Sequence, residues 1–183
     1  MKTVTKTEVN KGRNMRLLSL LCLGVLVVLA GCSLGPTGQE GPVTVVVNNS
    51  ANTSHTFEVW VVEGELINKE VRIRKKDGTV DRASPGPGLS TYKLDDDYGF
   101  VTSIELPSNR SRLHNRYTLD PGNLNRSSIE KFETGSTVVV VIYDGDRVRE
   151  LVAAHCDGDL VFVEVTMFEY GSGSAYNCEG GLF

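Results

Sequence analysis

The sequence predicts an all-β domain built as an antiparallel β-sandwich, and three observations support that class. Short runs rich in valine alternate apolar and polar residues, as half-buried strands do. Turn-forming residues separate these runs at near-regular spacing, and signals for helices are few. The 183 residues are 40% hydrophobic and 23% charged, which suits one globular domain with a targeting segment. About eight short strands are expected.

The first expected strands lie in the N-terminal half of the body. One run, TFEVWVVE, places Phe57, Val59 and Val61 on one face, the pattern of a strand packed against a core. Asp77-Gly78 marks a tight turn, and Ser84–Gly88 must be a loop because proline and glycine alternate there. The strand candidates of this half are Val43–Val47, Thr56–Glu63, Val71–Arg74, Tyr92–Leu94 and Phe100–Leu106.

The strongest strand candidates lie in the C-terminal half. Thr137–Tyr143 is an unbroken apolar run, which suits a strand buried on both faces. Arg147–Ala153 pairs naturally with it across Asp144-Gly145, a good hairpin turn. Leu160–Phe168 follows as a further strand.

One short helix and a core centre complete the expected body. Ser127–Phe132 offers an N-cap at Ser127 with Glu130 three residues later, enough for one or two helical turns. Trp60 is a plausible centre for the core between two sheets. The prediction is therefore a sandwich of immunoglobulin-like or cupredoxin-like type with at most one short helix.

A basic and then apolar leader precedes this body. Leu17–Ala30 carries no charge over fourteen residues, too short to span a bilayer, which takes about 20. Arg13 and Arg16 precede it and small residues follow, the order of a secretory signal; Met15 is an alternative start. Residues 1–31 have a net charge of +4 and the remainder −8. A nucleic-acid partner, which needs a broad basic surface, is disfavoured.

The end of the leader, Leu29, Ala30, Gly31 and Cys32, resembles the lipobox of prokaryotic lipoproteins. The resemblance implies that the Cys32 thiol receives a diacylglycerol and that the chain is cut just before it. Two acyl chains would hold the protein at the cell membrane, lipid-anchored on its extracytoplasmic face. The alternative is an ordinary secretory signal that leaves Cys32 a thiol. The implied parts are signal peptide 1–31, lipidated cysteine and flexible tether 32–42, and β-sandwich domain 43–183.

The whole chain is similar in style to small acidic surface lipoproteins of halophilic archaea. The similarity rests on Leu29–Cys32, on strands rich in Val, Thr and Asp, and on eleven arginines against eight lysines. It implies a β-sandwich body, and most such lipoproteins have no known function.

Two cysteines remain for the body, because Cys22 lies in the apolar leader and Cys32 is the expected lipid site. Cys156 and Cys178 form an even pair in an oxidising compartment, where a disulfide is their simplest use. If a turn near Gly171 returns the chain along Leu160–Phe168, Cys178 comes back beside the start of that strand. A free thiol or a metal ligand is the alternative.

A blue-copper site is the competing interpretation, which would make the protein an electron carrier. Such a site needs two imidazoles, a thiolate and a weak axial thioether. His155 precedes Cys156 and no histidine follows it, while His55 and His114 could join only by folding. Met167 falls in register with the apolar face of its strand and indicates core filling. That expected face consists of Val161, Val163, Val165 and Met167.

Signatures of catalysis are missing from the sequence. It contains no GxSxG, HExxH, Walker or GxGxxG motif. His155 and Cys156 are neighbours, and neighbours on a strand point to opposite faces, the wrong arrangement for a base and its nucleophile. We therefore expect a non-catalytic binding or envelope-interaction module with no cofactor, whose partner is an anionic envelope component or a surface protein.

An alternating cationic segment is the first candidate for binding. Arg110, Arg112, His114 and Arg116 would line one face of an extended chain and could hold an anionic envelope component or lipid headgroup. The alternative is a solvated edge that discourages aggregation. Clustered carboxylates could bind Ca²⁺ but suit solvated turns better. These clusters are Asp95–Asp97, Asp144-Gly145-Asp146 and Asp157-Gly158-Asp159.

Overall fold

A computed structural model describes residues 41–68, 70–94 and 98–180, all within one compact unit, residues 38–183. Every element with described bounds is a strand, which confirms the predicted all-β class, although the strands are twelve rather than about eight. They are β1 Gly41–Asn49, β2 His55–Val62, β3 Val71–Lys75, β4 Val80–Ala83, β5 Gly88–Lys93, β6 Val101–Glu105, β7 Ser111–Leu119, β8 Leu124–Phe132, β9 Thr137–Asp144, β10 Arg147–His155, β11 Asp159–Phe168 and β12 Gly171–Glu179.

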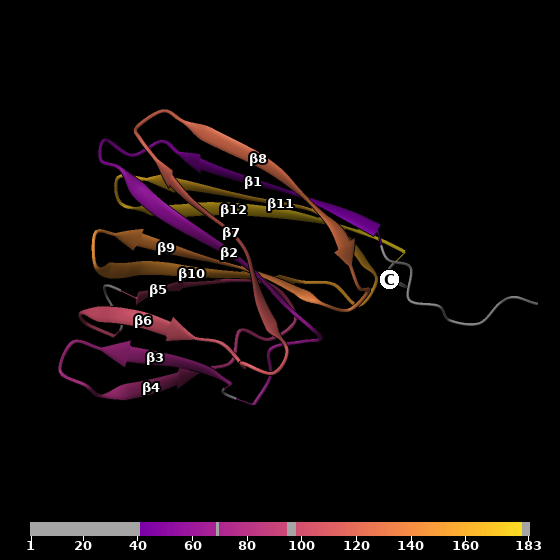
Figure 1. The fold of residues 1–183 in the computed structure, drawn as a ribbon, viewed down its shortest axis with the longest axis horizontal. Helices are drawn as coiled ribbons and strands as arrows, with labels where there is room; N and C mark the ends of the chain where they lie inside the picture. Colours follow the sequence, from indigo (N-terminus) through magenta and orange to yellow (C-terminus); the bar gives the residue numbers. More distant parts are fainter. Residues whose placement is uncertain (1–40, 69, 95–97, 181–183) are drawn as a thin grey trace, which may run out of the picture. The chain divides into compact units, whose positions relative to one another are not determined.

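The strands form three sheets stacked as layers (Figure 1). A four-stranded sheet, in the order β12-β11-β1-β8, packs against a five-stranded sheet, in the order β5-β10-β9-β2-β7. A three-stranded sheet, in the order β4-β3-β6, covers part of the other face of the five-stranded sheet. Among the described pairings β1 and β11 run parallel and the others antiparallel. The predicted sandwich is therefore present, with a third layer added.

Strand β9 lies at the centre of these layers, as its unbroken apolar run predicts. Val138 and Val140 belong to the core shared with the four-stranded sheet, whereas Val139 and Val141 belong to the core under the three-stranded sheet. Both faces are buried because successive side chains of a strand point in opposite directions. The predicted hairpin to β10 is also confirmed, and it turns at Gly145 with a φ of 60°.

Two local predictions are wrong, because strand pairing and packing between sheets override the local sequence signals. Ser127–Phe132 belongs to β8 and not to a helix, because its backbone pairs with β1 and Ser127 lies opposite Val45. Trp60 is only partly buried, at the margin of the second core, rather than central.

One face of β11 also departs from the prediction. Val163, Val165 and Met167 are buried in the first core as expected. A register shift between Leu160 and Phe162 puts Leu160 in that core, so Val161 is left half-exposed. A bulge of this kind changes which residue faces inward, and alternation alone does not reveal it.

A buried amide ties the β1–β2 loop to the end of β7. Asn49 is fully buried, and its side-chain Nδ2 donates to the carbonyl oxygens of Thr53 and Leu119, each at 2.8 Å. Its Oδ1 accepts the backbone N–H of Ala51 at 3.1 Å. Both N–H groups and the oxygen of the Asn49 side chain therefore have partners, which offsets the cost of burying a polar amide.

A buried carboxylate joins β10 of the five-stranded sheet to β12 of the facing four-stranded sheet. Glu150, on β10, is only 3% exposed and accepts hydrogen bonds from the backbone N–H and the hydroxyl of Ser172, at the start of β12. Gly171 has a φ of 143°, and a Cβ there would stand 3.1 Å from Glu150 Oε1. Glycine is therefore required for the turn to close over the carboxylate.

Candidate functional site

The lipobox residues Leu29, Ala30, Gly31 and Cys32 lie outside the described residues, as does Asp95–Asp97. Among the residues that are described, no helix is long and apolar enough to cross a membrane. Within the same residues, no group of three or more His, Cys, Asp or Glu side chains is placed to hold a metal ion.

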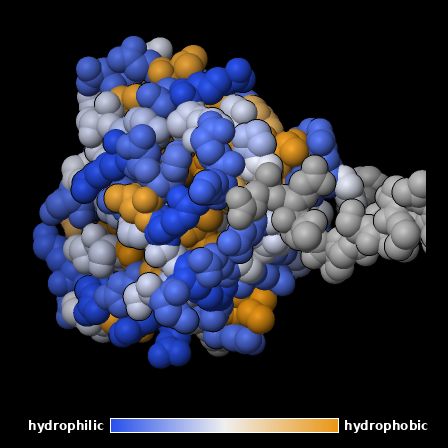
Figure 2. All heavy atoms as spheres, turned by 45° about the vertical axis from the view of Figure 1, so that its right-hand side comes forward, coloured by the Kyte–Doolittle hydropathy of each residue, from blue (hydrophilic) through white to orange (hydrophobic). Residues whose placement is uncertain are grey.

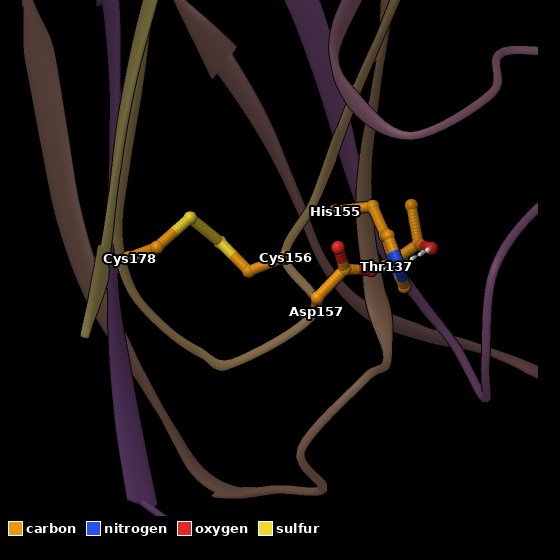
Figure 3. The surroundings of a disulfide bond; sticks show 5 residues. All are labelled: Thr137, His155, Cys156, Asp157 and Cys178. Atoms are coloured by element: carbon orange, nitrogen blue, oxygen red, sulfur yellow. Dashed lines mark hydrogen bonds and ion pairs between the residues drawn. A yellow bond between two sulfur atoms is a disulfide. The ribbon is translucent and has the colours of Figure 1, made fainter. Parts of the chain in front are cut away.

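The predicted disulfide between Cys156 and Cys178 is confirmed (Figure 3). Cys156 follows β10 of the five-stranded sheet, and Cys178 lies on β12 of the four-stranded sheet, opposite Leu160. The bond thus joins the two facing sheets where their shared core ends. The chain returns along β11 as expected, which brings the second cysteine beside the first.

His155 lies on the other side of the strand from this bond, as Figure 3 shows. It is buried, and its Nδ1 lies 3.3 Å from the hydroxyl of Thr137, which itself donates to the carbonyl of Gly64 at 2.8 Å. Its Nε2 lies 3.9 Å from Asp157. His155 therefore holds the strand ends together and is not paired with Cys156.

The ligands of the copper hypothesis do not converge. Cys156 is in a disulfide and offers no thiolate. His55 pairs with Leu119, whereas His114 lies about five residues further along β7, roughly 16 Å away. His155 lies opposite Thr137, at the other end of β2 from His55. The structure therefore contradicts a copper centre built from these residues.

The four cationic residues do not form one row. An irregularity in the β2–β7 pairing leaves His114 as an extra residue between Leu113 and Asn115, which pair with consecutive residues of β2. As a result Arg112 pairs with Val61 and Arg116 with Glu58, residues on opposite faces of β2. The prediction of a single cationic face is wrong, because a bulge reverses the alternation on which it rests.

Each cationic side chain instead has its own surroundings. Arg110 forms an ion pair with Glu70 and donates to the carbonyl oxygens of Glu63 and Glu65. Arg112 donates to the carbonyl of Lys131 at 2.9 Å. Burial first, and then Arg112, lower the pKa of His114 below its usual 6.5, which disfavours the charged form. The single cationic face is therefore absent, and the anionic partner expected for it stays a prediction.

Glu58 organises the exposed part of the five-stranded sheet's outer face. Its carboxylate, 13% exposed, accepts the indole N–H of Trp60 at 3.2 Å and the hydroxyl of Tyr143 at 3.0 Å. Arg116 lies 3.5 Å from the same carboxylate and 5.9 Å from the Tyr143 ring. Two aromatic rings and a guanidinium are thereby held by one anion, an arrangement that fixes their rotamers.

This contact predicts a loss of stability at alkaline pH. Burial, followed by the charge of Glu58, raises the pKa of Tyr143 above its usual 10.0. The folded protein then holds a proton that the unfolded chain releases, so the free energy of unfolding falls as pH rises above about 10, by up to about 1 kcal/mol per pH unit. Denaturant unfolding at pH 9 and 11 measures the fall.

The Tyr143→Phe variant should show a smaller fall over the same interval, because it has no hydroxyl to ionise. Tyr170→Phe is the matched control, since Tyr170 is 87% exposed, and it should follow the unmodified chain. Equal losses in the Tyr143→Phe protein and the unmodified chain would contradict the assignment.

A groove of about 700 Å³ adjoins Trp60, where the three-stranded sheet meets the outer face of the five-stranded sheet. Trp60 forms part of its wall together with apolar residues of β6 and the turn that follows it. Polar residues from β3 and the position before it, from the end of β6, from that turn and from the start of β7 complete the lining. The lining consists of Trp60, Glu70, Arg72, Ile104, Glu105, Leu106, Pro107, Ser108, Asn109 and Ser111.

Sequence reasoning did not find this groove. Its two sides come from segments far apart in the chain, and pairing of β3 with β6 brings Arg72 opposite Glu105. The one usable signal was the polar Glu58, two residues before Trp60 and between apolar neighbours in the strand. Because Trp60 was expected to lie in the core, that signal did not suggest a surface site.

A family model described as Halobacterial Ig domain protein matches residues 11–183. No curated protein matches the sequence. Among solved structures, a disulfide-locked mutant of intermedilysin with human CD59 is 10% identical, with a TM-score of 0.34 over 76% of this chain and 24% of that chain. A structure titled "Trapped Toxin" is 8% identical, with a TM-score of 0.32 and coverage of 76% and 24%. This chain thus spans about a quarter of their length, and likeness so weak supports no inference.

Proposed function

Because this chain belongs to the halobacterial Ig domain proteins, we propose that it is a non-catalytic binding module held by lipid at the extracytoplasmic face of the cell membrane. An Ig-like β-sandwich domain fits a non-catalytic module. The observation that carries the location is the sequence Leu29-Ala30-Gly31-Cys32 at the end of a short apolar segment.

The disulfide supports this location independently. Disulfides persist in oxidising compartments and are rare in the cytoplasm. In this chain the bond joins two sheets and involves Cys156, which is buried. A body of this kind is suited to the outer side of the membrane.

The composition of residues 32–42 supports an anchored body. Gly35, Pro36, Gly38, Gly41 and Pro42 lie in the stretch after Cys32 and favour an irregular tether. The last two of these residues, Gly41 and Pro42, are also the first residues of β1, so the proposed tether leads directly into the folded body. A binding surface on such a module would meet components of the envelope.

The test is a Cys32→Ser substitution, analysed by lipid labelling, membrane fractionation and intact mass. Without the thiol there is no thioether, so the label should be lost completely and the protein should leave the membrane fraction or remain unprocessed. The unmodified protein should carry lipid on an N-terminal Cys32.

Cys22→Ser is the matched control, because Cys22 lies within the apolar leader and should leave labelling unchanged. Lipid labelling that survives in Cys32→Ser, or an unmodified Cys32 in the mature protein, would refute the anchor.

A further inference from the structure

The groove beside Trp60 has an aromatic wall that can contact a ligand only through the surface of the indole ring. Trp60 is the only tryptophan in the chain. Its indole N–H is donated to Glu58, so what it can offer a ligand in the groove is ring surface. Ile104, Leu106 and Pro107 extend the apolar wall.

The charged residues of the groove are already paired with one another or with neighbours. Glu105 lies 2.5 Å from Arg74 and 3.4 Å from Arg72, and Glu70 is paired with Arg110. The hydrogen bond from Arg74 is the main cause that lowers the pKa of Glu105, so its carboxylate stays ionised and keeps these pairs. A charged ligand would have to compete with an existing ion pair, whereas an uncharged ligand would not.

The rim of the groove offers both hydrogen-bond donors and hydrogen-bond acceptors. Ser108 and Asn109 are exposed in the turn between β6 and β7, and their side chains both donate and accept. Ser111, next to them at the start of β7, has a buried hydroxyl with no hydrogen-bond partner among the described residues. The polar side therefore complements neighbouring hydroxyl groups better than a single charge.

The face of the molecule that Figure 2 presents offers no broad apolar patch. Figure 2 shows apolar residues as small patches separated by hydrophilic side chains on the face it presents. Recognition there would depend on a shaped site rather than on a wide apolar contact.

We infer that the groove binds a neutral saccharide, with the C–H face of a sugar ring on Trp60 and its hydroxyls on Asn109, Ser108 and the Arg72–Glu105 pair. A volume of about 700 Å³ is within the range of small-molecule sites, about 300–1,000 Å³, and accommodates a short oligosaccharide. This inference rests on the proposed binding function and names its ligand class.

The single tryptophan makes the test direct. The full chain, extracted in detergent, is titrated with neutral oligosaccharides of glucose, galactose, mannose and N-acetylglucosamine while the fluorescence of Trp60 is followed. A saturable change is expected for at least one of them. The affinity should not fall as ionic strength rises, because no net charge is engaged.

Asn109→Ala tests the rim, and it is safe for folding because Asn109 is exposed in a turn. Loss of its hydrogen bonds should weaken binding roughly fivefold. Asn52→Ala is the matched control, since Asn52 is an exposed asparagine in the β1–β2 loop and does not line the groove. The affinity of this variant for the saccharide should equal that of the unmodified protein.

Three outcomes would overturn the inference. They are no saturable response to any of the neutral saccharides, tighter binding of polygalacturonate than of neutral sugars, and a response to a proline-rich peptide in place of sugars. None of them affects lipid labelling at Cys32, so failure of the ligand class and failure of the anchor are distinguishable.

Discussion

Replacing Asn49 by alanine is expected to lower the free energy of unfolding by about 3 kcal/mol. The substitution removes two donors and one acceptor from a fully buried position. The carbonyl oxygens of Thr53 and Leu119 and the N–H of Ala51 lose these partners, and a buried polar group without a partner costs about 1–3 kcal/mol. Urea unfolding followed by tryptophan fluorescence measures the change.

Asn48→Ala is the matched control, because Asn48 is the neighbouring residue and its side chain bonds only the exposed hydroxyl of Ser50, at 3.3 Å, among its described contacts. Its effect should stay within about 0.5 kcal/mol, as for most surface substitutions. Similar losses in the two variants would show that the Asn49 network contributes nothing specific.

Removing the disulfide is expected to cost a similar amount. Cys156 and Cys178 close a loop with a sequence separation of 22, and restricting a loop of that length in the unfolded chain is worth about 3 kcal/mol. The double variant Cys156→Ala/Cys178→Ala should therefore unfold at a lower urea concentration. Its midpoint should match that of the unmodified protein measured with a reductant.

Reductant itself provides the control, because it should lower the urea midpoint of the unmodified protein and leave the midpoint of the double variant unchanged. Alkylation of both thiols in the unmodified protein without reductant would contradict the disulfide. So would an unfolding midpoint that does not respond to reductant.

Sequence periodicity predicted most of the strands and the central position of β9. The local predictions that are wrong fail because distant segments of the chain pair with one another. Ser127–Phe132 carries a local helix signal, but the backbone of that segment pairs with β1, which lies about 80 residues earlier in the chain. Local propensity is a weak term beside sheet pairing and burial.

The candidate sites divide in the same way. The disulfide could be predicted, because two cysteines remained and one turn brought them together. The cationic row could not, because the bulge at His114 depends on how β7 pairs with β2. The groove also required tertiary structure, since Trp60, Arg72 and Asn109 belong to separate strands and turns.

The sequence by itself determined that this chain forms strands and which faces of β2 and β9 are apolar, and it favoured a bond between Cys156 and Cys178. These properties follow from a two-residue period and from residue chemistry, both of which are local. Only the tertiary structure decided that a third sheet leaves a groove beside Trp60 and that Glu58 holds its indole. The reason is that contacts between sheets join residues far apart in the chain, and one bulge is enough to change which side chains meet.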